Sequence, residues 1–201
     1  MKKNRFAAVA LAALMIFSAV SCNGNRPDRN NSDSSYGMSM NDTNQDKLAS
    51  SEVDVDIAQE VVENETAFKV NSVIDSGHKD DNNKHYVFLN VTIKNQSSTD
   101  WELSMLNNFY LLMPDGTESH YDIRTQFYAD KNFKNYTETP FTISAGTEFT
   151  GYIGGFLVDD SVSEFSVCYF PTGADDKNKA VVIKCPVKAA DMISPPEDMI
   201  G

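Results

Sequence analysis

The chain has 201 residues, a formal net charge of −12 and an aromatic content of 10%. This length accommodates one domain with flanking segments or two very small ones, and its apolar residues suffice for one sizeable core. The first 21 residues carry three basic side chains and no acidic one, so the remaining chain has 14 basic against 29 acidic side chains, or −15. Because such a surface repels phosphate, we expect no nucleic-acid partner.

Residues 1–21 have the organisation of a secretory signal peptide. Three basic residues precede an apolar region, 6–17, that is too short to cross a bilayer. Ala19-Val-Ser21 followed by Cys22 resembles the lipobox of bacterial lipoproteins, in which the cysteine is acylated and becomes the first mature residue. The resemblance implies lipidation of Cys22 and a place on the extracytoplasmic side of the bacterial cell membrane. The alternative is an ordinary secretory signal with an incidental cysteine.

Composition divides the rest of the chain into three parts. Residues 22–51 are expected to be a lipidated N-terminus and disordered linker, because no run of large apolar residues could offset the entropy of ordering them. About thirty such residues would hold a domain roughly 30 Å from the membrane. The folded domain is expected at 52–187, followed by a C-terminal tail at 188–201.

Residues 86–95 give the clearest strand signal, with apolar and other side chains alternating at period two. The side chains expected to face the core are Val87, Leu89, Val91 and Ile93. Those expected to point the other way are Tyr86, Phe88, Asn90, Thr92 and Lys94. We therefore predict a half-buried strand.

Shorter stretches of the same kind predict further strands on both sides of this one. They lie at 53–57, 68–74, 101–113, 118–121, 141–143, 149–157, 165–170 and 181–187. Pro114-Asp-Gly116 predicts a hairpin turn, and Gly151, Gly154 and Gly155 indicate a bulge or the close approach of a neighbouring backbone. Eight or so short strands with almost no helix predict an antiparallel sandwich.

Two segments between these strands are less regular. Residues 76–84 are small and charged and predict a loop. Residues 122–139 contain aromatic side chains among polar ones, which predicts either a long connection held by those rings or a short helix.

The order of these signals resembles the DUF4352 family. The likeness rests on the strand Tyr86–Asn95 with its VTIKN end, the hairpin Asn108–Gly116, the turn Ser144–Gly146 and the strand start Thr150-Gly151, and it covers about 67–170. Members are bacterial cell-surface proteins similar in fold to the mycobacterial secreted antigen MPT63. The resemblance implies an all-β, immunoglobulin-like antiparallel β-sandwich, and it supplies no catalytic residues.

Possible metal ligands occur in acidic surface segments. The predicted loop carries His78 and His85 with Asp80 and Asp81 between them, but no ordered ligand spacing is present. The pairs Asp159-Asp160 and Asp175-Asp176 lack the alternating spacing and closing glutamate of an EF-hand. We expect solvated loops, with no metal and no cofactor.

Two further features remain ambiguous in the sequence. Trp101 could stack on a sugar or anchor a partner, although in sandwiches large aromatic residues mostly fill the space between sheets, which we expect here. Cys168 and Cys185 form a possible disulfide in an exported domain. Alternation places them on different strand faces, which argues against a bridge unless a bulge intervenes. The sequence does not decide between a disulfide and two free thiols.

Compact catalytic motifs such as G-x-S-x-G or a glycine-rich phosphate loop do not occur. We therefore expect a non-enzymatic binding or interaction module, attached to the membrane by its lipid, for an unknown protein or glycan of the cell envelope. The alternative is an envelope hydrolase or small-ligand carrier with a site built from dispersed carboxylates and aromatic residues. A converging pocket with a displaced carboxyl pKa would favour that alternative.

Overall fold

The structure is a computed structural model that describes residues 51–171 and 181–200. The predicted signal peptide, Cys22, nearly all of the linker and the pair Asp175-Asp176 lie outside these residues. No helix in the described ranges is both long and apolar enough to span a membrane.

Strands dominate the described chain. They are β1 (Ser51–Asp54), β2 (Val61–Glu63), β3 (Thr66–Lys79), β4 (Lys84–Asn95), β5 (Trp101–Leu103), β6 (Phe109–Leu112), β7 (Glu118–Ser119), β8 (Phe141–Ile143), β9 (Glu148–Asp159), β10 (Glu164–Tyr169) and β11 (Val181–Lys188). The helices are α1 (Met105–Asn108), α2 (Ile123–Asn132), α3 (Glu197–Ile200) and the 3-10 helix η3 (Ala189–Asp191).

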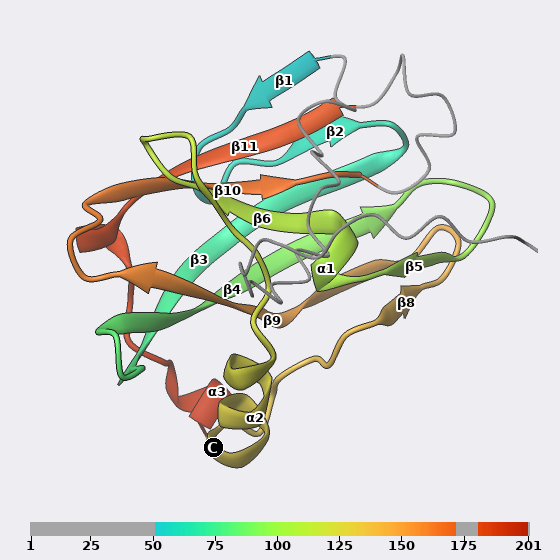
Figure 1. Cartoon of the computed structure of the whole chain (residues 1–201). Coiled ribbons are helices and arrows are strands. Elements are labelled where there is room, and N and C mark those ends of the chain that lie inside the picture. The colour runs from blue at the N-terminus through green and yellow to red at the C-terminus, as the bar shows by residue number, and fades with distance from the viewer. Residues whose placement is uncertain (1–50, 172–180, 201) are drawn as a thin grey trace, which may run out of the picture. The chain divides into compact units, whose positions relative to one another are not determined.

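Two sheets pack face to face (Figure 1). One has the order β1-β11-β10-β6-β7 and the other β2-β3-β4-β9, while β5 and β8 form a separate pair. All neighbours are antiparallel except β1 and β11, which are parallel. The predicted immunoglobulin-like antiparallel sandwich is confirmed.

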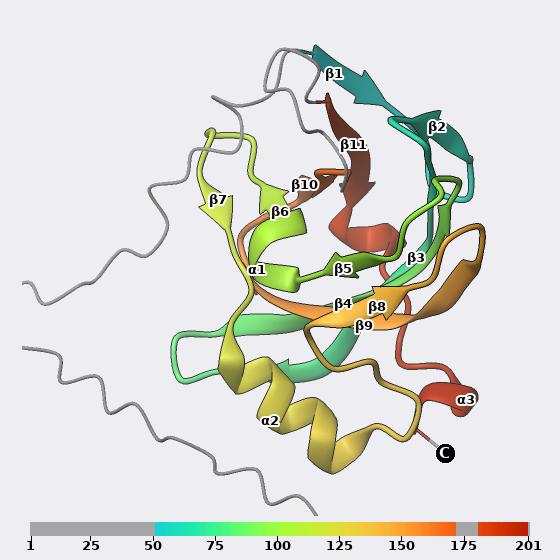
Figure 2. The ribbon, with the colours of Figure 1, turned by 90° about the vertical axis from the view of Figure 1, so that its right-hand side faces the viewer.

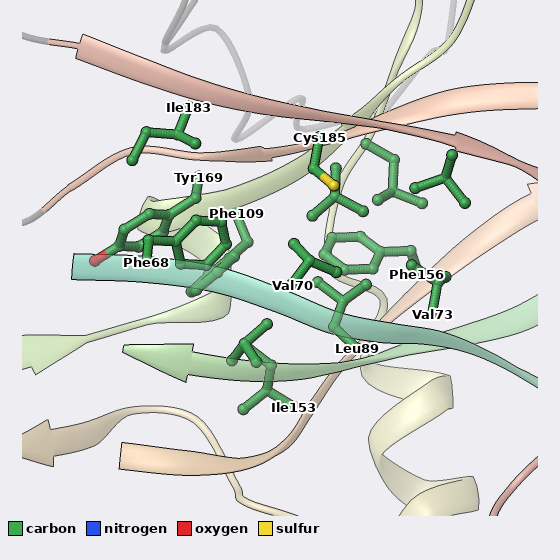
Figure 3. Close-up of a cluster of buried hydrophobic side chains, with 14 of the residues drawn as sticks. Phe68, Val70, Val73, Leu89, Phe109, Ile153, Phe156, Tyr169, Ile183 and Cys185 are labelled. Carbon is green, nitrogen blue, oxygen red and sulfur yellow. The ribbon is translucent and has the colours of Figure 1, made fainter. Parts of the chain in front are cut away.

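The main core lies between the sheets, where side chains of β3, β4 and β9 meet those of β6, β10 and β11 (Figure 3). Phe68 stacks on Tyr169 across this space, with ring centroids 4.4 Å apart. The four predicted core residues of β4 are fully buried. The inward face of that strand is therefore confirmed.

The outer face of β4 is also largely buried, which corrects the prediction of a half-buried strand. Tyr86, Phe88 and Thr92 expose only 6%, 0% and 8% of their surface. The first two belong to a second apolar cluster with side chains of α2 and α3, among them Ala129 and Met199. Figure 2 shows both helices against this side of the sandwich. Strand periodicity reports the alternation of faces but not what covers the second face.

The connection 122–139 contains α2 and protects the free edge of β9. Its backbone donates from Asp122 N to Gly155 O (3.1 Å) and from Thr137 N to Tyr152 O (2.8 Å). Gly155 N donates in turn to Thr125 Oγ1 at 3.1 Å. An exposed strand edge would be a template for association, and this segment occupies it. Of the two alternatives, a helix is present.

The glycines of β9 mark a bulge, as predicted. Val87 is opposite Phe156 whereas Phe88 is opposite Gly154, so Gly155 is the extra residue. A Cβ atom on Gly155 would lie 2.6 Å from the Val87 carbonyl oxygen. Only glycine permits this approach.

The predicted loop 76–84 and the C-terminal tail both contribute ordered structure to the fold. The predicted loop 76–84 is mostly strand, because β3 continues to Lys79 and β4 begins at Lys84. The tail 188–201 is folded back as far as residue 200. Ile193 exchanges backbone hydrogen bonds with Val73 and Asp75, and Met199 is fully buried. The C-terminal segment therefore completes the second cluster.

Candidate functional site

A groove of about 710 Å³ opens between the β6–β7 hairpin and the end of β9, and we call it the hairpin groove. Its lining residues are Lys84, Met113, Pro114, Asp115, Thr117, Glu118, Ser119, His120, Tyr121, Asp122, Leu157, Asp159, Ser161, Val162 and Ser163. Ser119 Oγ donates to Leu157 O at 2.8 Å and so ties β7 to β9. The volume falls in the range of ligand pockets.

Each wall of the groove has a turn closed by an aspartate. Asp115 Oδ1 accepts from Thr117 Oγ1 (2.7 Å) and Thr117 N (2.9 Å). Asp159 Oδ1 likewise accepts from Ser161 Oγ (2.6 Å) and Ser161 N (3.0 Å). These side-chain and backbone hydrogen bonds lower the pKa of both carboxyls. Both groups are therefore held in place as anions.

The segment joining β7 to α2 supplies the remaining polar groups. His120 Nε2 lies 2.9 Å from Glu118 Oε2, and their side chains are only 16% and 18% exposed. Asp122 caps α2. Hydrogen bonds from the Arg124 side chain and from the Arg124 backbone N–H lower the pKa of the Asp122 carboxyl. Burial, reinforced by nearby Asp130, raises the pKa of Tyr121 to about 12. Tyr121 is therefore neutral at physiological pH.

Acidic groups outnumber basic ones along the groove. Among the described residues that line the groove, Asp115, Glu118, Asp122 and Asp159 face one lysine, Lys84, besides the histidine. A general acid needs a raised pKa, whereas the displaced carboxyl pKa values here are lowered. The arrangement suits attraction of a cationic group better than proton donation.

A second polar network adjoins the groove at the β9–β10 turn. His85 Nδ1 lies 2.7 Å from Asp75 Oδ2, and His85 Nε2 lies 2.7 Å from Asp160 Oδ1. Lys79 Nζ also contacts Asp160 Oδ1 at 2.9 Å. Hydrogen bonds from His85 and Lys79 lower the pKa of Asp160. The network fastens the β3–β4 hairpin to the turn that forms one groove wall.

Of the residues considered as metal ligands, His85 and Asp160 come together in the network above, whereas His78 and Asp80 have other partners. His78 stacks on Tyr128, with ring centroids 4.8 Å apart, while His85 belongs to the network above. Asp80 Oδ1 closes the β3–β4 turn by accepting from Asn82 N and Lys84 N. Within residues 51–171 and 181–200, no group of three or more His, Cys, Asp or Glu side chains is placed to hold a metal ion.

The two ambiguous sequence features have structural positions. Trp101 is 4% exposed and pairs with Ile143 of β8, so its expected packing role is confirmed. No disulfide joins Cys168 to Cys185. Cys185 is opposite Val167 and faces the main core, whereas Cys168 is opposite Lys184 and belongs to a cluster on the other face. The possible disulfide is absent because the two cysteines are offset by one residue on adjacent strands, so their side chains lie on opposite faces of the sheet.

Only two parts of the groove carry a signal in the sequence, namely Pro114 and Asp115 of the predicted hairpin turn and Asp159 of the pair Asp159-Asp160. Glu118 and His120 fall within a predicted strand, and nothing in their spacing indicates that they pair. The groove joins residues 113–122 to residues 157–163, and only the strand order of the fold brings these segments together.

A family model for a domain of unknown function, DUF4352, matches residues 55–179, more than half of the chain. The chain belongs to the DUF4352 family. The family predicted from the sequence is thus confirmed, and its description assigns no activity to this DUF4352 domain.

Solved structures resemble this DUF4352 domain at low identity. The ycdA protein of Bacillus subtilis subsp. subtilis str. 168, a candidate lipoprotein, is 20% identical with a TM-score of 0.47; the match covers 66% of this chain and 39% of that chain. The yjhA protein of Bacillus subtilis is 15% identical with a TM-score of 0.43, over 65% and 98% of the two chains. The secreted protein MPT63 of Mycobacterium tuberculosis is 10% identical with a TM-score of 0.41, over 66% and 97%.

No curated protein sequence matches the chain. The chain spans less than half the length of the ycdA structure. Neither finding assigns a ligand to the DUF4352 domain.

Proposed function

We propose that this chain is a membrane-anchored extracytoplasmic lipoprotein whose immunoglobulin-like domain is a non-catalytic binding module with the hairpin groove as its contact site. The signal-like segment ending at Cys22 supports the anchor, since acyl chains supply membrane affinity that an acidic chain lacks. The partners are the membrane, through the lipid, and a protein or glycan of the cell envelope.

The acidic groove carries this proposal. Its aspartates are fixed by turns and by a helix cap, and their lowered pKa values keep them ionised. A pre-organised anionic surface attracts a basic patch on a partner, and salt screens that attraction beyond about 8 Å at physiological ionic strength. Binding should therefore weaken as salt rises.

The test uses two substitutions that remove charge but keep the turns. An asparagine at position 115 or 159 retains the Oδ1 acceptor for Thr117 or Ser161, so Asp115→Asn with Asp159→Asn should preserve the groove shape. The full-length variant and wild type are isolated from solubilised envelopes, and co-purifying proteins and glycans are quantified across salt concentrations. Asp81→Asn is the control, because Asp81 is exposed and does not line the groove.

We expect the double variant to lose the partner that wild type and Asp81→Asn retain. Equal retention by all three would contradict the groove as the contact site. A hydrolase or ligand carrier remains the alternative. Turnover that disappears in Glu118→Gln, with the fold intact, would move the protein to the enzyme class.

The anchor has a separate test. A metabolically incorporated fatty-acid analogue should label the wild-type chain and not Cys22→Ala. Equal labelling of both chains would contradict acylation at Cys22.

A further inference from the structure

The outer surface of α2 carries two exposed apolar side chains that the groove does not use. Ile123 and Phe127 lie about one helical turn apart and expose 51% and 68% of their surface. Among the described residues, Phe127 is the most exposed large apolar side chain. The opposite face of α2 buries Thr125 and Ala129, so the helix has one packed face and one open face.

Charged side chains of opposite sign lie at equal spacing on either side of Phe127. Arg124 precedes Phe127 by three residues and Asp130 follows it by three, and both are exposed. Lys131 follows Phe127 by one turn, as Ile123 precedes it. A two-fold axis through Phe127 that pairs two antiparallel copies of α2 would place Arg124 opposite the partner's Asp130, and the reverse. The same axis would place the stem of Lys131 over the partner's Ile123.

Arg124 is held in a position to take part in such a contact. Its Nε and Nη2 donate to Asp122 Oδ1 and Oδ2 at 2.9 and 2.8 Å, and Nη1 lies 3.3 Å from Asp80 Oδ2. A guanidinium group has five N–H donors, so two hydrogens remain for another carboxylate. Its side chain is 51% exposed.

We propose that the outer face of α2 is a two-fold interface between two copies of this chain, centred on Phe127. α2 lies at the end of the sandwich opposite β1 in both views (Figures 1 and 2), and β1 is the strand that follows the predicted linker in the sequence. One helix pair buries less than the roughly 800 Å² per partner of a stable complex, so the association is weak in dilute solution. Confinement of lipid-anchored copies to one membrane raises their effective concentration, a step that rests on the proposed anchor.

Cysteine cross-linking in native membranes tests the proposal with the full-length chain. Cys22 carries its acyl group in the proposed lipoprotein, and Cys168 and Cys185 are fully buried, so a new surface cysteine dominates oxidation by a short-range oxidant. Phe127→Cys should form a covalent dimer about tenfold more than Leu106→Cys, because only position 127 lies on the axis. Leu106 is a matched control on α1, 54% exposed. Equal cross-linking at the two positions would overturn the interface.

A charge change tests the predicted register. Adding Asp130→Lys to Phe127→Cys places like charges opposite each other twice and should reduce the dimer about tenfold, whereas Asp130→Glu should retain it. No difference between these variants would contradict the antiparallel register.

Two further readouts distinguish the helix pair from loss of the anchor and from a lipid contact. The first is fractionation of the same cells, which reports on the anchor independently of the interface. If the chain is found in the soluble fraction, cross-linking is measured in a concentrated solution of the protein. Absence of the cross-link in that solution would overturn the interface. The second readout is an environment-sensitive dye attached at position 127. If brominated lipids quench this dye and Phe127→Cys forms no cross-link, the helix faces lipid instead of a second copy of the chain.

Discussion

Gly155 allows β9 to pass the backbone of β4, because a Cβ atom there would lie 2.6 Å from Val87 O and 3.0 Å from the Phe88 ring. Gly155→Ala should therefore lower the free energy of unfolding by about 1–3 kcal/mol through overpacking. Gly151→Ala is the control in the same strand, since its nearest contact is the tip of the partly exposed Phe149 ring, which can move. Urea unfolding of both variants measures the difference; equal effects would contradict the close approach.

The two strand thiols should be unreactive in the native protein and reactive after unfolding. Burial, with a smaller effect of Asp56, raises the pKa of the Cys185 thiol to about 11, and both sulfurs are buried. Labelling with a maleimide at pH 8, without reductant, should modify neither cysteine in the native state and both in denaturant. If denaturant alone exposes neither thiol and reductant is also required, a disulfide joins Cys168 to Cys185, and this result would contradict the register of β10 and β11.

Single residues show where prediction from the sequence succeeds. The inward residues of β4 follow from period two alone, because burial of one sheet face requires that alternation. Thr92 shows the limit: it accepts from Asn71 and contacts Thr150, so a polar outward residue is buried by its neighbours. Such contacts depend on segments that local patterns do not connect.

At the scale of elements, α2 begins at a charged cap whose contribution depends on pH. Asp122 accepts from Arg124 N and pairs with its guanidinium, so Asp122→Ala should cost about 1 kcal/mol of stability at neutral pH. The pKa of Asp122 is lowered in the folded state, so the charge stabilises the fold above the ordinary carboxyl pKa of about 4 and this contribution is lost as pH falls.

The corresponding measurement compares wild type, Asp122→Ala and Asp122→Asn by urea unfolding between pH 7 and pH 3. The gap between wild type and Asp122→Ala should narrow as the solution is acidified. Asp122→Asn should keep part of the cap because its amide oxygen still accepts. A gap that stays constant with pH would show that the charge of Asp122 contributes nothing.

Elements differ in how well their sequences predict them. Most strands and the Pro114-Asp-Gly116 hairpin have local signals and occur near where expected. The stretch 101–113, predicted as strand, is wrong in its middle, because α1 separates β5 from β6, and β2 is not among the predicted strands. α2 exposes Ile123 and Phe127 and buries only two residues, so its periodicity is too weak to separate a helix from a connection. α3 is four residues long and is stabilised by tertiary packing through Met199, which no local pattern reveals.

At the scale of the whole molecule, the family and the sandwich follow from the order of strand and turn signals, whereas the groove does not. Its two walls come from hairpins far apart in the sequence, and the network of Asp75, His85 and Asp160 holds one wall in place. The fold therefore brings together charges that are individually ordinary. This arrangement is the basis for proposing a binding role for one end of the sandwich.

Site-specific photo-cross-linking in living cells tests that role most directly. A photoreactive residue is placed at Met113 or Ser163, one on each wall of the groove, or at exposed Ser98, which follows the opposite end of β4. We predict that both groove positions capture the same envelope partner, that Ser98 does not, and that Asp115→Asn with Asp159→Asn abolishes the capture. Capture from Ser98 as strong as from the groove, or capture unchanged in the double variant, would contradict this prediction.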